Sequence, residues 1–123
     1  MDGMKDYLFL DDERVPHDVI WNGNHRLYQY DYLWDIVRTQ PQFEAYILEH
    51  GIPSVVSFDN DLGTGMGEGI FCAQWLVDQV LDGNVKWNPN VTFLVHSKNG
   101  VAADRIKGLL NNFISFIENE TRR

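Results

Sequence analysis

The sequence predicts a small three-layer α/β protein built on a parallel four-stranded sheet with the strand order 2-1-3-4. Two observations lead to this fold class. Short apolar runs alternate with longer amphipathic stretches, which is typical of parallel strands joined by crossovers. The chain also has 123 residues, of which 44% are hydrophobic, and this suits a single domain over residues 1–123 with one core.

Four apolar runs are the predicted strands. The first is Tyr7–Leu10, and an irregular stretch over residues 17–31 separates it from the second, Leu33–Thr39. The third and fourth are Ser54–Phe58 and Val91–Val95. The third and fourth runs are rich in apolar and β-branched residues, which indicates strands buried on both faces of the sheet.

Three helices are predicted between and after these strands. Pro41 suits the first turn of a helix that ends before Gly51. Ile70–Leu81 is the second helix, and the third carries apolar residues at helical spacing over residues 106–117. The glycine-rich loop 63–69 lacks the Lys-Ser/Thr ending of a phosphate-binding loop, so we expect a flexible segment or a tight helix entry there.

Charge and composition limit the possible functions. The formal net charge is −8, so we expect no extended grip on double-stranded nucleic acid. No apolar run reaches membrane length, and the N-terminal sequence MDGMKD does not resemble a signal peptide, so we expect a cytoplasmic protein without membrane contact. The single cysteine, Cys72, lies in an apolar helical stretch and is expected to be a buried thiol.

Polar residues follow three of the four predicted strands. They are, in chain order, Asp11, Asp12, Asp59, Asp61, His96, Ser97, Lys98 and Asn99. Ligands of open parallel sheets bind beyond the carboxyl ends of the strands, next to the point where the strand order reverses. We therefore expect these residues to gather in one site.

Four carboxylates at one edge of a sheet repel one another unless a cation balances them. A divalent metal is the simplest solution, with Asp11, Asp12, Asp59 and Asp61 as its predicted ligands. Oxygen ligands favour Mg²⁺, and Mn²⁺ or Ca²⁺ are the alternatives.

Each motif taken alone also has a structural explanation. The Asp11-Asp12 pair suits a turn or a helix cap, and a lone histidine such as His96 is more often a hydrogen-bonded core residue than a catalyst. Their occurrence at the ends of three neighbouring strands favours a real site. The segment 17–33 fits a lid, a partner surface or plain filler, and its aromatic residues, Trp21 among them, suit an interface or substrate wall and core packing equally well.

The acid pair after the first strand and the aspartate after the third resemble response-regulator receiver domains, which share the flavodoxin-like strand order. In receivers the acid pair binds Mg²⁺ and the later aspartate accepts a phosphoryl group, and Asp11, Asp12 and Asp59 match those positions. This chain departs from them because we expect no fifth strand with its essential lysine. Ser97 corresponds to the receiver's Thr/Ser, and Lys98 is a possible spatial substitute for the lysine.

Three blocks give a closer resemblance. "LFLDDERVP", "SFDNDLG" and "VHSKNGVAADRI" are similar to the DDxRxP, DxDLG and HSxN motifs of the cyclic-phosphate-processing receiver-like family of phages and bacteria. Gly100 stands where that family tends to have proline. The resemblance implies a receiver-like fold that acts on cyclic phosphate esters of nucleotides or RNA ends, in the host cytoplasm if the protein is phage-encoded.

The residues and the resemblance together lead to a hypothesis of metal-dependent phosphodiester hydrolysis. Asp59 and His96 are the predicted catalytic residues, with His96 as the proton donor to the leaving ribose oxygen. The predicted substrate-binding residues are Arg14, Ser97, Lys98 and Asn99. The alternatives are a phosphoacceptor switch at Asp59, a non-catalytic module that binds a nucleotide or an unknown protein, and a metal-dependent nuclease.

Overall fold

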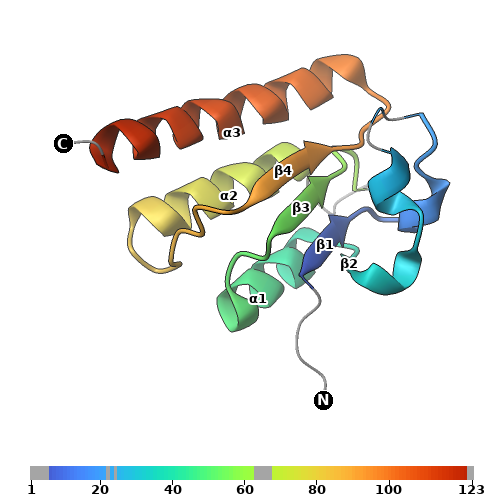
Figure 1. Cartoon of the computed structure of the whole chain (residues 1–123), viewed down its shortest axis with the longest axis horizontal. Helices are drawn as coiled ribbons and strands as arrows, with labels where there is room; N and C mark the ends of the chain where they lie inside the picture. The colour runs from blue at the N-terminus through green and yellow to red at the C-terminus, as the bar shows by residue number, and fades with distance from the viewer. Residues whose placement is uncertain (1–5, 22, 24, 63–67, 122–123) are drawn as a thin grey trace.

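The computed structural model describes residues 6–21, 23, 25–62 and 68–121 of the chain. Its sheet has four parallel strands in the order β2-β1-β3-β4, as the sequence predicts (Figure 1). The strands are β1 (Tyr7–Leu10), β2 (Trp34–Val37), β3 (Val55–Phe58) and β4 (Thr92–Val95). The described residues form a receiver-like α/β fold.

The four strands are equally long and end in step. Leu10 of β1 pairs with Val37 and Phe58, and Phe58 pairs with Val95. Whatever follows these four residues must therefore meet at one edge of the sheet. This shared register is what allows residues far apart in the sequence to form a single site.

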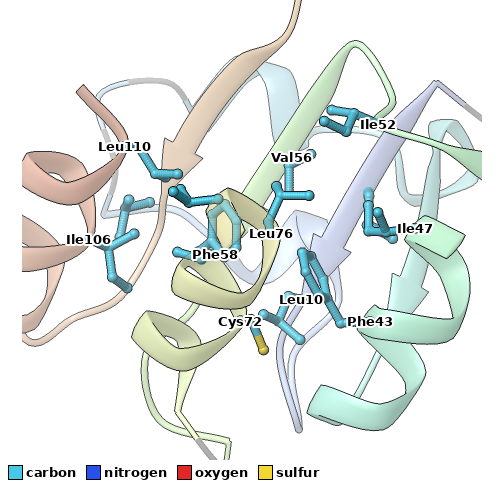
Figure 2. Packing of buried hydrophobic residues seen from close by; sticks show 14 of the residues in the cluster. Leu10, Phe43, Ile47, Ile52, Val56, Phe58, Cys72, Leu76, Ile106 and Leu110 are labelled. Atoms are coloured by element: carbon cyan, nitrogen blue, oxygen red, sulfur yellow. The ribbon is translucent and has the colours of Figure 1, made fainter. Parts of the chain in front are cut away.

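Three helices cover one face of the sheet: α1 (Gln40–His50), α2 (Gly69–Leu81) and α3 (Gly100–Thr121) (Figure 1). They bury Phe43, Leu76 and Ile106, among others, against Val56 and Phe58 of β3 (Figure 2). Burial of apolar side chains in such a core is the main stabilising contribution in a domain of this length. Cys72 belongs to this core, which confirms the predicted buried thiol.

The opposite face is covered by the segment between β1 and β2, so the protein has three layers. This segment carries short 3₁₀ turns at Pro16–Asp18, His25–Tyr28 and Asp31–Leu33. Tyr28 stacks on Trp34, with ring centroids 5.2 Å apart, and both belong to a second core cluster with Phe9. Core packing is thus one role of the segment that the sequence left open.

Both expected ends of the second strand were wrong. The second strand is shorter than Leu33–Thr39 because Leu33 closes a 3₁₀ turn and the side chain of Thr39 accepts the N–H of Gln42 to cap α1. The last helix begins at Gly100. None of the helices in the described part of the chain combines the length and the hydropathy that a membrane span requires.

The glycine-rich loop that precedes α2 lies outside the described residues from 63 to 67. Gly69, its last residue, begins α2 against the backbone of Asp59. A Cβ at Gly69 would lie 1.8 Å from the carbonyl oxygen of Asp59, so no other residue fits there without a backbone shift. The expectation of a tight helix entry is confirmed at this residue.

Candidate functional site

Three buried polar residues meet where the sheet ends. Asp11, Asp59 and His96 each directly follow a strand, and their backbone N–H groups extend the ladder to Val37, Leu10 and Phe58 respectively, at 2.9–3.1 Å. Potential ligand atoms of the three side chains all lie within 4.8 Å of one another. The predicted convergence of these residues at one edge is present in the structure.

Asp11 uses both carboxylate oxygens within the protein. Its Oδ1 accepts the backbone N–H groups of Glu13 and Arg14 at 2.9 Å each. Its Oδ2 lies 3.1 Å from Nε2 of His96 and 3.4 Å from a guanidinium nitrogen of Arg14. Burial raises the pKa of Asp11, but the hydrogen bonds outweigh it and lower the pKa to about 2. Asp11 is therefore an ionised acceptor.

His96 contacts Asp11 and has no exposed surface. Its ring stacks on Phe9 at 4.3 Å, and its Nδ1 lies 2.6 Å from the hydroxyl oxygen of Ser57. That oxygen in turn lies 2.7 Å from the hydroxyl of Tyr28. Burial lowers the pKa of His96, against the effect of the hydrogen bond with Asp11. The ring is thus neutral at neutral pH.

These contacts fix the direction of a buried hydrogen-bond chain. Because Asp11 can only accept, Nε2 of neutral His96 carries the proton, and Nδ1 accepts the hydroxyl of Ser57. Ser57 then accepts the hydroxyl of Tyr28, whose pKa burial raises to about 12. This hydrogen-bond chain runs from Tyr28 in the outer layer to Asp11 at the site.

The negative charges of Asp59 and Asp12 are less well stabilised by the protein than the charge of Asp11. Asp59 is 4% exposed; burial and the charge of Asp11 raise its pKa to about 7, although Arg14 lies 3.7 Å away. Burial and the charges of neighbouring acids, Asp61 included, also raise the pKa of Asp12. Both carboxylates border an excess of negative charge.

An open cleft of about 560 Å³ lies in front of the buried residues. It is lined by Asp12, Glu13, Arg14, Asp59, Asn60, Asp61, Glu68, Ser97, Lys98 and Asn99. Of the residues that the sequence nominated, Asp11 and His96 are absent from this lining. The lining also includes three that were not nominated: Glu13, Asn60 and Glu68.

The loop after β4 shapes one wall of the cleft. The hydroxyl of Ser97 accepts the backbone N–H of Asn99 at 3.2 Å, and the side-chain oxygen of Asn99 accepts the N–H of Ala102 at 3.1 Å. Asn99 therefore caps the N-terminus of α3, which begins directly after the loop that lines the cleft.

Other residues that support the site had weaker sequence signals. Arg38 donates to the backbone carbonyl of Asp11 at 3.0 Å and to that of Arg14, which holds the loop after β1. The expectation of a strand through Thr39 hid this role. Ser57 lies within the apolar strand β3, and Tyr28 reaches it across 29 residues, so no local pattern indicates their contact.

A divalent cation fits the chemistry of the cleft. Burial and, after it, repulsion by Asp11 raise the pKa of Asp59 despite the nearby Arg14, and a bound cation would stabilise the ionised carboxylate. Asp12, Asp59 and Asp61 present oxygen donors to the cleft, as hard cations require. Asp11 and His96 are close enough to share the ion, but both nitrogens of His96 are engaged in hydrogen bonds.

No curated protein matches the chain, but a comparison with solved structures agrees with this architecture. The chain is similar to a solved structure described as the yeast Spc42 trimeric coiled coil, amino acids 181–211, fused to another structure, with a TM-score of 0.51 and 18% identity. The match covers 89% of this chain and 65% of that chain, and at this identity it shows the fold alone.

A family model gives a more specific match. The model describes a cyclic-phosphate-processing receiver domain, and it matches residues 6–112. This range includes all four strands and every residue that lines the cleft. The chain therefore belongs to the cyclic-phosphate-processing receiver domain family.

Proposed function

We propose that this domain hydrolyses a cyclic phosphate ester of a nucleotide or RNA end with the help of a divalent cation, for which Mg²⁺ is the first choice. The observation that carries the proposal is the composition of the cleft. Carboxylates suited to a cation and the polar or cationic groups of Ser97, Lys98 and Arg14 line the same open space. A phosphate bound there would contact both sets of groups.

In the proposed reaction, water attacks the phosphorus and one ring P–O bond breaks. The released ribose oxygen takes up a proton, and the product is a phosphate monoester. Asp12, Asp59 and Asp61 would hold the cation, which when bound supplies charge neutralisation and activation of water. Arg14 and Lys98 would bind the phosphate oxygens.

The burial of His96 argues against direct contact between its ring and the substrate. The ring is fully buried and is absent from the cleft lining. We propose that it acts as a positioning residue, which keeps Asp11 ionised and oriented toward Arg14. Proton transfer from His96 to the leaving oxygen stays a prediction.

A turnover assay tests the proposal. The purified domain would be given 2′,3′-cyclic and 3′,5′-cyclic nucleotides and cyclic oligonucleotides, with Mg²⁺, Mn²⁺ or a chelator. We expect turnover that requires metal and falls about 100-fold or more in Asp59→Asn. Asp104→Asn removes an exposed acid of α3 outside the cleft and is the matched control. Metal-independent turnover, or full activity of Asp59→Asn, would contradict the proposal.

A phosphoacceptor switch is the second candidate, because Lys98 lines the same cleft as Asp59. The chain would then take a phosphoryl group onto Asp59 from a donor such as acetyl phosphate. Intact-mass analysis after incubation with acetyl phosphate and Mg²⁺ separates the two candidates. A stable phosphoryl adduct that is lost in Asp59→Asn, without turnover of cyclic phosphates, would favour the switch.

A further inference from the structure

Trp21 lies beside two cationic residues that line the cleft and makes three contacts that the proposed reaction does not use. Its indole N–H donates to the backbone carbonyl of His96 at 3.1 Å. The guanidinium carbon of Arg14 lies 5.0 Å from the centre of the indole ring, and the ammonium nitrogen of Lys98 lies 4.6 Å from it. One ring is thus fixed to the end of β4 and contacts both cations of the cleft.

The environment of Lys98 makes this contact informative. Five acids line the cleft, yet none of the ion pairs between described residues includes Lys98. An ammonium over the face of an indole gains an attraction comparable to that of an exposed ion pair. The contact with Trp21 therefore offers the ammonium group of Lys98 an alternative to pairing with the acids of the cleft.

Arg14 also contacts the ring of Trp21. Its guanidinium lies near the carboxylates of Asp11 and Asp59 on the inner side and near the ring of Trp21. Trp21 is 36% exposed, so the residue remains accessible beside the two cations. The two positive charges come from loops that are 84 residues apart in the sequence, and Trp21 is the shared surface that brings them together.

We propose that Trp21 is a positioning residue that holds Arg14 and Lys98 as a pair for the phosphate group of the substrate. This inference rests on the proposed function in one respect, since it assigns the same cleft to a phosphate ester. It adds a residue from the outer layer to the site. It also gives the segment between β1 and β2 a role in ligand binding as well as in core packing.

Two substitutions separate the ring face from the hydrogen bond. Trp21→Phe and Trp21→Leu both remove the indole N–H, but only Trp21→Phe keeps an aromatic face. We expect Trp21→Leu to bind inorganic phosphate about three- to tenfold more weakly than the wild type, with Trp21→Phe in between. The measurement is a calorimetric or NMR titration with phosphate in the presence of Mg²⁺. Tyr32→Leu, which removes an aromatic residue that is 70% exposed and outside the cleft lining, is the control.

A direct readout of the contact accompanies the titration. The side-chain methylene protons of Lys98 next to the ammonium should show an upfield ring-current shift that disappears in Trp21→Leu. Equal phosphate affinities of the wild type and Trp21→Leu, or no phosphate binding by the wild type, would overturn the inference. An unshifted Lys98 signal in the wild type would overturn it as well.

The proposed hydrolysis and the proposed role of Trp21 can fail separately, and the experiments distinguish the two failures. If no cyclic phosphate is turned over but phosphate still binds and does so more weakly in Trp21→Leu, the inference stands and hydrolysis does not. If hydrolysis occurs and Trp21→Leu leaves the KM unchanged, hydrolysis stands and the inference is wrong.

Discussion

The acid cluster has an inner half and an outer half, and the two differ in how their charges are compensated. In the inner half, Asp11 accepts two backbone N–H groups and the ring N–H of His96. In the outer half, Asp12 and Asp59 border the cleft and have raised pKa values. Two neighbouring aspartates, Asp11 and Asp12, thus lie in opposite environments.

The difference indicates that only one half is prepared for an external partner. Among the described residues, every buried side-chain polar atom has a hydrogen-bond partner, so the inner half is complete within the protein. The outer carboxylates keep an excess of negative charge that a cation would balance. The following experiments test this division, beginning with the largest expected effect.

Asp11→Ala should destabilise the fold strongly, whereas Asp12→Ala should not. Loss of the Asp11 carboxylate leaves the N–H groups of Glu13, Arg14 and His96 without an acceptor. We expect a loss of about 3–5 kcal/mol in the free energy of unfolding, against less than about 0.5 kcal/mol for Asp12→Ala. Urea denaturation measures both, and similar losses for the two variants would refute the division into halves.

Asp59→Asn should stabilise the metal-free protein at high pH. The folded pKa of Asp59, about 7, lies above its ordinary value of about 4, so ionisation of this buried group opposes folding as pH rises between these values. The free energy of unfolding of Asp59→Asn should equal that of the wild type below pH ~4 and exceed it by at most about 4 kcal/mol above pH ~7.

The measurement for Asp59 is thermal or urea unfolding in chelator across this pH range, with Asp104→Asn as the exposed control. Addition of Mg²⁺ should stabilise the wild type by mass action and do so less in Asp59→Asn. A variant that gains no stability at pH 8, or that responds to Mg²⁺ as the wild type does, would argue against an uncompensated carboxylate in the outer half.

Ser57 and Tyr28 should act as one unit in the inner half. Ser57→Ala removes the donor to His96 and leaves the hydroxyl of Tyr28 without an acceptor, at an expected cost of about 1–3 kcal/mol. Adding Tyr28→Phe to that variant should cost little more, because the stranded hydroxyl is removed. A double-mutant cycle measures this coupling, and additive losses would show that the chain is not a unit.

The smallest effect concerns a second histidine–aspartate pair, which is exposed. His17 lies 2.6 Å from Asp31, and this hydrogen bond raises the pKa of His17, in contrast to buried His96. The pair should contribute stability below the unfolded pKa of about 6.5 and lose that contribution as pH rises through the folded pKa. NMR titration should give a lower His17 pKa in Asp31→Asn, and an unchanged value would exclude the pairing in solution.

Much of the fold and the location of the site could be predicted from local patterns. Apolar runs separated by helical stretches indicate parallel strands, and Asp11, Asp59 and His96 each follow one of them directly. Since parallel strands of equal length end together, residues that follow them share an edge of the sheet. The family motifs coincide with these positions because that edge is where the fold can present polar side chains.

Burial and direction depended on contacts between distant segments, which no local pattern contains. Whether Asp11 or Asp12 turns inward depends on the N–H groups and the ring that surround it. Tyr28 reaches Ser57 across 29 residues, and Trp21 reaches the carbonyl of His96 across 75. The sequence placed the acids at the end of the sheet; long-range packing then set which carboxylate is neutralised inside and which remains available in the cleft, because charge compensation in a protein depends on three-dimensional neighbours.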